Sequence, residues 1–223
     1  MLIRKIEPVT TIDFPGVISA LVYTVGCNMR CPYCYNYSLF EDEPDDYDLT
    51  DNALKEIKNN KLINGVVITG GEPTIHNNLP QFIKSIKQLG LKVKLDTNGT
   101  NPTMLNMCLP YVDYVAMDVK TDLHHYHMLR WFYPENIQLS IMYLKNSGIP
   151  HEFRITCVEP FVNHRNIEMI GRMLDGAEKV CLQKARLENI FEPDIKMKAS
   201  DTEKLKYYQN ILLRYVKNVE LRL

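Results

Sequence analysis

Residues 17–36 read VISALVYTVGCNMRCPYCYN, an apolar run that passes directly into a loop with three cysteines. The run, residues 17–25, predicts a buried strand because it is short and rich in β-branched side chains. The loop, residues 26–37, therefore begins at the carboxyl end of that strand. In α/β proteins, active-site loops gather at this end of the strands.

Outward from this stretch, short β-branched runs alternate with longer helical patterns. Further strands are predicted at residues 66–69, 92–95, 111–119, 153–158, 179–182 and 219–221. Helices are predicted at residues 49–60, 78–89, 136–146, 163–174 and 200–216. Because strands that alternate with crossover helices pair in parallel, the sequence predicts the α/β class, with a parallel sheet and outer helices in a barrel or part of one.

Composition limits the remaining choices. The chain has 223 residues, a formal net charge of −1, 45% hydrophobic and 24% charged residues, which indicates a single domain over residues 1–223 that ends in the helix and strand of about 200–222. A nearly neutral chain has no overall attraction to nucleic acid or to an acidic membrane. No apolar stretch approaches the ~18 residues of a membrane span, and the N-terminus lacks a signal peptide's apolar core. We therefore expect a cytoplasmic protein without nucleic-acid or membrane partners.

Three of the six cysteines, Cys27, Cys31 and Cys34, form a CxxxCxxC loop. Thiolates at such short spacing are typical iron–sulfur ligands. With three ligands nearby, a [4Fe–4S] cluster keeps one iron open, much as a catalytic zinc keeps an open position. A structural zinc site or accidental clustering are the alternatives, but His76 and the histidines of residues 124–127 form no paired-ligand motif. The other cysteines (Cys108, Cys157 and Cys181) are expected to be buried small hydrophobic residues.

Polar motifs follow the next predicted strands. They are GGEP at residues 70–73, DTNG at 96–99 and DVK at 118–120. Since the carboxyl ends of parallel strands share one edge of a sheet, we expect these motifs to converge with the cysteine loop. Glycines, exposed carbonyls and a carboxylate at residues 70–72 suit an ammonium group, although the motif also fits an ordinary tight turn. Residues 118 and 120 point to the same face of a strand, with a solvated pair as the alternative.

With its aromatic residue before the third cysteine, the loop resembles the signature of the radical S-adenosylmethionine (SAM) superfamily, and the resemblance covers nearly the whole chain. It implies a partial (β/α)6 barrel. In that superfamily the open iron chelates the amino and carboxylate groups of SAM. One electron from the reduced cluster then cleaves SAM to methionine and a 5′-deoxyadenosyl radical.

DTNG and DVK resemble strand-end motifs of the glycyl-radical-enzyme activases. By this resemblance Asp118 and Lys120 contact the methionyl part of SAM, whereas Asp96 and Thr97 lie beside a monovalent cation. Arg154 stands out as the charge in an apolar run, and it either lies near SAM or pairs with an acidic residue such as Glu72 or Asp118. The residues implied to bind the cofactor are Asn36, Gly70, Gly71, Glu72, Asp96, Asp118, Lys120 and Arg154.

DFPG at residues 13–16, KLDTNG, VDYVAMDVK and EFR together are similar to the activating proteins of anaerobic ribonucleoside-triphosphate reductase. The resemblance implies a glycyl radical enzyme as partner, with residues 11–16 beside the groove for the target polypeptide. No second CxxC set is present, so an external donor such as flavodoxin or ferredoxin would supply electrons. Tyr35 stands where many activases have the histidine of CHN. The histidine- and tyrosine-containing stretch 124–133 fits either a partner surface or a helix with a solvated face.

Two other functions stay open from the sequence. One is a radical SAM enzyme that acts on a small molecule, in modified-base or cofactor biosynthesis. The other is a metal-binding interaction module without turnover. The size of the chain favours an activase, because a short chain with few insertions suggests an open barrel that admits a peptide loop.

Overall fold

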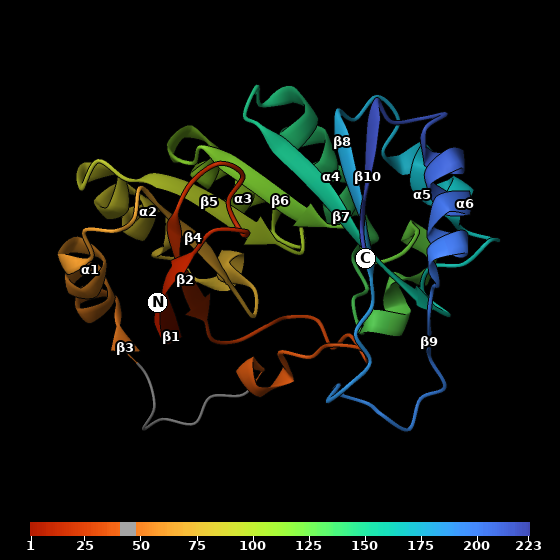
Figure 1. The fold of residues 1–223 in the computed structure, drawn as a ribbon, viewed down its shortest axis with the longest axis horizontal. Helices are drawn as coiled ribbons and strands as arrows, with labels where there is room; N and C mark the ends of the chain where they lie inside the picture. The colour runs from red at the N-terminus through yellow and green to blue at the C-terminus, as the bar shows by residue number, and fades with distance from the viewer. Residues whose placement is uncertain (41–47) are drawn as a thin grey trace.

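The computed structural model describes residues 1–40 and 48–223. Within them, parallel strands form one sheet in the order β10-β8-β7-β6-β5-β4-β2 (Figure 1). Their bounds are β2 (Ser19–Thr24), β4 (Gly65–Gly70), β5 (Lys92–Thr97), β6 (Tyr114–Asp118), β7 (His151–Glu159), β8 (Lys179–Lys184) and β10 (Asn218–Arg222). The neighbours follow chain order, as expected for successive crossovers of one hand.

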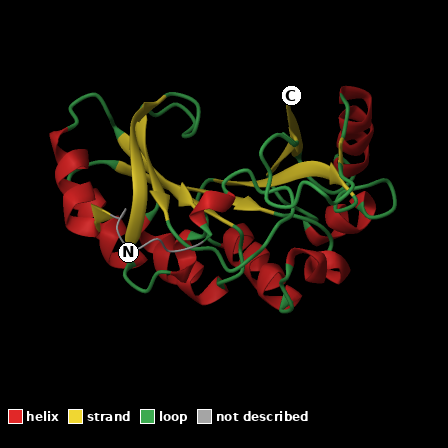
Figure 2. Ribbon diagram, turned by 90° about the horizontal axis from the view of Figure 1, so that it is seen from below, coloured by secondary structure: helices red, strands yellow, loops and turns green. Residues whose placement is uncertain are grey.

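A helix lies between each pair of successive parallel strands. These are α1 (Thr50–Asn59), α2 (Leu79–Gln88), α3 (Pro102–Cys108), α4 (Pro134–Asn146), α5 (Ile167–Met173) and α6 (Thr202–Leu212). The helices cover one side of a strongly curved sheet and leave its inner side open (Figure 2). The predicted α/β class, with its mostly parallel sheet and outer helices, is confirmed.

Strict alternation was an incomplete prediction, because three antiparallel strands join the sheet. β1 (Leu2–Thr10) pairs with β2, β3 (Asp48–Leu49) pairs with β1, and β9 (Lys198–Ala199) pairs with β7. Helix α3 was also not predicted. Its start carries a clear signal, since the Asn101 side chain caps the backbone N–H of Met104 and a proline follows the cap.

The main core lies between the helices and the sheet. Because side chains alternate along a strand, polar residues next to core residues face the inner side of the sheet. In β7, Phe153 and Ile155 are fully buried in this core. Glu152 and Arg154, one residue out of step with them, face the inner side of the sheet. No helix among the described residues is both long and apolar enough to cross a membrane.

Candidate functional site

A cavity of about 880 Å³ opens at the carboxyl end of the parallel strands. Every residue that the sequence singled out for the cluster or the cofactor lines it. These residues are Cys27, Cys31, Cys34, Asn36, Gly70, Gly71, Glu72, Asp96, Asp118, Lys120 and Arg154. The structure thus brings together side chains that lie up to 127 positions apart in the sequence (residue 154 minus residue 27).

The cysteine loop is held by backbone hydrogen bonds to distant parts of the chain. At its start, the N–H of Gly26, which has a positive φ of 83°, donates to the Leu39 carbonyl at 2.7 Å. In its middle, the N–H of Arg30 donates to Leu129 at 3.0 Å. The Arg30 guanidinium also donates to the carbonyl of Cys27 at 2.6 Å. Because these bonds use backbone and guanidinium groups, they leave the thiols free.

A segment after β8 closes the other side of the loop. The N–H of Phe191 donates to the Cys34 carbonyl and the N–H of Glu192 to the Pro32 carbonyl, both at 3.0 Å. Outside the loop, Glu192 also forms an ion pair with Arg130. These bonds fix the backbone around the third cysteine.

The three thiols share the cavity. Burial raises the pKa of Cys27 to about 11 and that of Cys31 to about 12, and it also raises the pKa of Cys34. The thiols are therefore protonated at neutral pH unless a metal displaces the protons. Among the described residues, no group of three or more His, Cys, Asp or Glu side chains is arranged to hold a single metal ion. In a [4Fe–4S] cluster each thiolate binds a different iron, so this donor set fits such a cluster.

The other three cysteines are fully buried, and none of them lines this cavity. Cys108 and Cys157 pack in the apolar core, which confirms that they serve as small hydrophobic residues. Cys181 differs, because its thiol lies 3.2 Å from a carboxylate oxygen of Glu152 on the inner side of the sheet.

Two glycines bring the end of β4 against the base of the cysteine loop. A Cβ at Gly71 would lie 1.9 Å from the Gly26 carbonyl oxygen, and one at Gly70 would lie 2.3 Å from the Thr24 nitrogen. The close approach allows the N–H of Glu72 to donate to Gly26 at 2.8 Å. The glycines are thus required for contact between two parts of the protein itself.

The Glu72 carboxylate is held by hydrogen bonds from the protein itself. It is 1% exposed, and Oε1 accepts hydrogen bonds from the Thr74 N–H (3.1 Å), the Thr74 hydroxyl (2.5 Å) and the Thr97 hydroxyl (2.7 Å). Oε2 accepts one from the Asn98 N–H at 2.6 Å. Burial raises the pKa of Glu72 although these bonds oppose the rise. The carboxylate therefore joins the ends of β4 and β5, and the cavity is left with the backbone of this motif.

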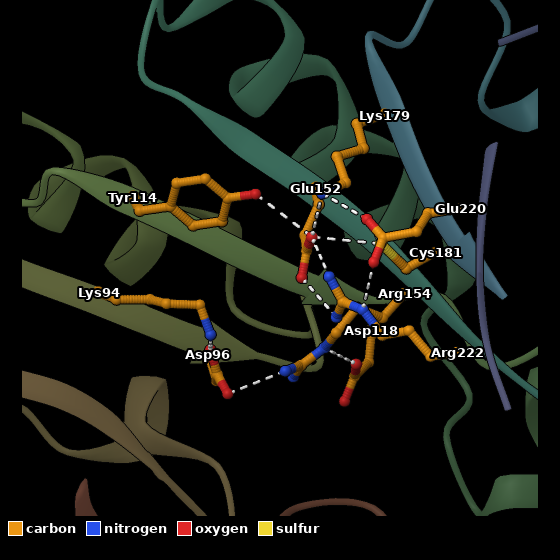
Figure 3. A network of polar contacts seen from close by, with 10 residues as sticks. All are labelled: Lys94, Asp96, Tyr114, Asp118, Glu152, Arg154, Lys179, Cys181, Glu220 and Arg222. Carbon is orange, nitrogen blue, oxygen red and sulfur yellow. Dashed lines mark hydrogen bonds and ion pairs between the residues drawn. The ribbon is translucent and has the colours of Figure 1, made fainter. Parts of the chain in front are cut away.

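A row of alternating charges crosses β5, β6 and β7 beside the cavity, and Figure 3 shows it from Lys94 to Asp118. Lys94 Nζ lies 2.5 Å from Asp96 Oδ1, and Asp96 Oδ2 lies 3.0 Å from Arg154 Nη1. Arg154 Nε lies 2.7 Å from Asp118 Oδ1, and Asp118 Oδ2 lies 2.8 Å from Lys120 Nζ. We call these five residues the charge row.

Ion pairs within the charge row keep Asp118, Lys120 and Arg154 ionised despite their burial. Burial would raise the pKa of Asp118, but Arg154 and Lys120 hold it below its usual value. Burial would lower the pKa of Lys120, but Asp118 raises it well above the usual value, and Asp118 and Asp96 do the same for Arg154. The expected ion pair of Arg154 is formed with Asp118 and not with Glu72.

The expectation that Arg154 is the only charge in its run was wrong. Glu152 lies two residues earlier on the same face and is 2% exposed. Arg222 donates to both of its oxygens, at 2.9 and 2.8 Å, and Tyr114 donates to one at 3.3 Å (Figure 3). Lys179 adds a further positive charge at 3.4 Å. The inner side of the sheet is thus charged well beyond the strand ends.

Three residues that line or support the site were given no individual role by sequence reasoning. Lys94 could have been found, because it lies two residues before Asp96 in a buried strand and so shares its face. Asn98 directs its amide at Asn28 Oδ1 (3.1 Å) and toward Cys27 Sγ (4.0 Å), which the sequence does not indicate. Tyr33 is 6% exposed, and its hydroxyl has no hydrogen-bond partner among the described residues.

Residues 124–129 of the stretch 124–133 lie in a short 3-10 helix, Leu123–Leu129, whose first turn is capped by Asp122. Tyr126 and Leu129 are buried, and the three histidines of this stretch are exposed. The expected helix with a solvated face is therefore confirmed. This helix also helps to shape the cysteine loop, because its Leu129 carbonyl accepts the hydrogen bond from the N–H of Arg30.

Several known proteins resemble this chain in sequence. A Methanocaldococcus jannaschii protein, provisionally named a glycyl-radical enzyme activating enzyme, is 27% identical over 234 residues, which cover 99% of this chain and 95% of that protein. A pyruvate formate-lyase-activating enzyme of Staphylococcus epidermidis is 31% identical over a match that covers 44% of this chain and 41% of that protein. A 7-carboxy-7-deazaguanine synthase of Hyperthermus butylicus is 38% identical over 40% of this chain and 38% of that protein.

Solved structures and a family profile agree with this resemblance. The structure of TYW1 with a lysine-pyruvate adduct matches with a TM-score of 0.62 at 16% identity, over 88% of this chain and 73% of that one. Streptococcus suis SuiB bound to precursor peptide SuiA matches with a TM-score of 0.65 at 14% identity, over 91% of this chain and about half (47%) of that one. The radical SAM superfamily profile matches residues 21–175. The chain belongs to the radical SAM superfamily, whose members use a [4Fe–4S] cluster and S-adenosylmethionine.

Proposed function

We propose that Cys27, Cys31 and Cys34 each bind one iron of the [4Fe–4S] cluster. Their shared cavity and their free thiols support this assignment. Binding requires the loss of a proton from each thiol, because the thiolate is the ligand. Residues 1–223 would then act as one catalytic domain in the cytoplasm, with residues 26–37 as the cluster loop.

The same cavity provides groups for the amino-acid end of SAM. We assign Lys120, an ammonium at the end of the charge row, to the carboxylate of SAM, with Asp118 beside it. The backbone of Gly70 and Gly71 is assigned to the amino group, since the Glu72 carboxylate is occupied by the protein itself. Arg154 and Asp96 hold Asp118 in place. Asn36 lines the cavity beside the third cysteine.

The cluster and SAM held by these residues would supply the radical chemistry. One electron from an external donor such as flavodoxin or ferredoxin would cleave SAM to methionine and a 5′-deoxyadenosyl radical, and that radical would take a hydrogen atom from a glycine Cα of a partner protein. The chain's own part is to orient SAM and to limit access of water. The partner would be a glycyl radical enzyme, and the DFPG opening and KLDTNG favour anaerobic ribonucleoside-triphosphate reductase.

The observation that carries the activase proposal is the relative provisionally named as an activating enzyme, because its similarity extends over 99% of this chain. A radical SAM enzyme that acts on a small molecule is the second candidate. Its support is narrower, because the 7-carboxy-7-deazaguanine synthases match only about two fifths of the chain.

The test is anaerobic. Protein reconstituted with iron and sulfide is mixed with SAM and a reductant, and 5′-deoxyadenosine is measured, with Cys31→Ala as the inactive comparison and Cys108→Ala as the matched control. We expect product from the wild type and from Cys108→Ala, and none from Cys31→Ala. Equal, negligible product from all three would reject radical SAM chemistry.

A second experiment identifies the hydrogen-atom donor. The active protein is incubated with anaerobic ribonucleoside-triphosphate reductase, and the mixture is examined by electron paramagnetic resonance. A glycyl-radical doublet on the reductase supports the proposal. Turnover of a small metabolite without any doublet on a partner supports the second candidate.

A further inference from the structure

The Asp96 carboxylate already holds a cation on each of its oxygens. Lys94 Nζ lies 2.5 Å from Oδ1, and Arg154 Nη1 lies 3.0 Å from Oδ2. The neighbouring Thr97 hydroxyl donates to Glu72 at 2.7 Å, and its oxygen accepts the N–H of Gly99 at 3.1 Å. The monovalent cation expected beside Asp96 and Thr97 therefore does not fit, because the oxygens that would bind it are engaged by the protein.

Lys94 is held inside the protein at considerable cost. Its side chain is 3% exposed, and a buried ammonium needs an opposite charge to be tolerated. Lys92 faces the same way two residues earlier on β5 and is exposed. Burial of Lys94 is thus specific to its position beside Asp96, and it is not shared by the other lysine on that face.

Lys94 also sets the charge of the row. The row contains three cations, Lys94, Arg154 and Lys120, and two anions, Asp96 and Asp118. With Lys94 the sum is +1, and without it the sum is zero. With Lys94 present, each carboxylate is shared between two cations. The excess positive charge suits a ligand that carries a carboxylate.

We propose that the Lys94 ammonium is a built-in counter-ion in this site, so that SAM binding by this chain needs no alkali-metal ion. Lys94 is a positioning residue. It acts through Asp96 and Arg154 on Asp118 and Lys120. The inference rests on the proposed assignment of Asp118 and Lys120 to SAM.

The test measures the dissociation constant of SAM for cluster-loaded protein by equilibrium dialysis. Binding is compared in choline chloride without alkali metals and in the same ionic strength of NaCl or KCl. We expect the wild type to bind SAM equally, within twofold, in all three salts. In Lys94→Met, affinity should fall about tenfold or more in choline and recover at least partly in KCl, because a free cation can then reach Asp96. Lys92→Met is the matched control and should behave as the wild type.

Several outcomes would overturn the inference. Wild-type affinity that rises saturably with K⁺ or Na⁺ would show a metal ion beside Asp96, and unchanged binding by Lys94→Met in choline would show that the ammonium has no such role. A loss in Lys94→Met that no alkali-metal ion restores would indicate a merely structural lysine. If Lys94→Met does not fold, Lys94→Gln and the wild-type salt comparison still decide. Wild type that binds SAM in none of the salts would instead refute the proposed function.

Discussion

Replacing Glu72 by glutamine separates two roles for this residue, a brace within the protein and a ligand for SAM. The amide retains one acceptor oxygen. If that oxygen stays with the two threonines, the new NH2 group faces the N–H of Asn98, whose 2.6 Å hydrogen bond is lost. A hydrogen bond to a charged acceptor contributes about 1.5–3 kcal/mol. Removing a buried charge offsets part of this loss, so we expect Glu72→Gln to lower the free energy of unfolding by about 1–2 kcal/mol.

Glu72→Ala removes every acceptor and is expected to cost more. The backbone N–H groups of Thr74 and Asn98 are then left buried without their partner. Each unsatisfied donor costs about 1–3 kcal/mol, so the expected loss is about 2–6 kcal/mol. Glu188, an exposed carboxylate that lines the same cavity, provides the control, and Glu188→Gln should leave the free energy of unfolding unchanged.

Urea unfolding of the metal-free proteins measures these differences, and SAM affinity is measured on the cluster-loaded proteins. If Glu72 acts as a brace within the protein, Glu72→Gln should clearly lower the free energy of unfolding and change SAM affinity by less than threefold. The reasoning fails if Glu72→Gln unfolds at the wild-type urea concentration but binds SAM ten times more weakly. That result would mean that the carboxylate turns toward the cofactor.

Other substitutions test the remaining parts of the site. Burial would raise the pKa of Glu152, but Arg222 holds it at about 2. The stabilising effect of the ionised carboxylate is therefore present above about pH 4.5 and is lost as the pH falls toward 2. In pH-dependent urea unfolding, Glu152→Gln should show about 1–2 kcal/mol less acid destabilisation than the wild type, and parallel curves for the two proteins would contradict this. Tyr33→Phe removes a hydroxyl without a partner among the described residues, so cluster-free protein should melt no lower than wild type. The melting-temperature shift on adding SAM to cluster-loaded protein should shrink, and equal shifts would show that the hydroxyl meets no ligand. Gly71→Ala places a Cβ 1.9 Å from the Gly26 carbonyl oxygen, and iron–sulfur absorbance after reconstitution should fall severalfold, whereas normal loading would show that the two backbones can separate.

Sequence reasoning succeeded where local pattern decides the structure. Helix α2 was predicted over residues 78–89 and spans Leu79–Gln88, because Leu79, Phe82, Ile83 and Ile86 recur at helical spacing and form one buried face. Strand β1 was missed for the opposite reason. Its residues include charges and a proline and show no clear apolar alternation. The strand is stabilised by antiparallel pairing with β2, which the residues of β1 do not reveal.

The same division holds in the candidate site. Convergence of the motifs was predictable, since parallel strands carry their carboxyl ends to one edge. The partners within the site were not. Arg154 meets Asp118 because the register of β6 and β7 places these two residues opposite each other. The inward turn of Glu72 likewise depends on donors at the end of β5, which no spacing within GGEP reveals.

The bonds from Phe191 and Glu192 to the cysteine loop have a consequence for how the protein is made. The loop lies in the first fifth of the chain, and the residues that close it lie in the last fifth. A nascent chain that ends before residue 191 carries all three cysteines but lacks both of these bonds. The loop therefore reaches its final form only after residues 191 and 192 have left the ribosome, so that its thiols stay incompletely enclosed until then.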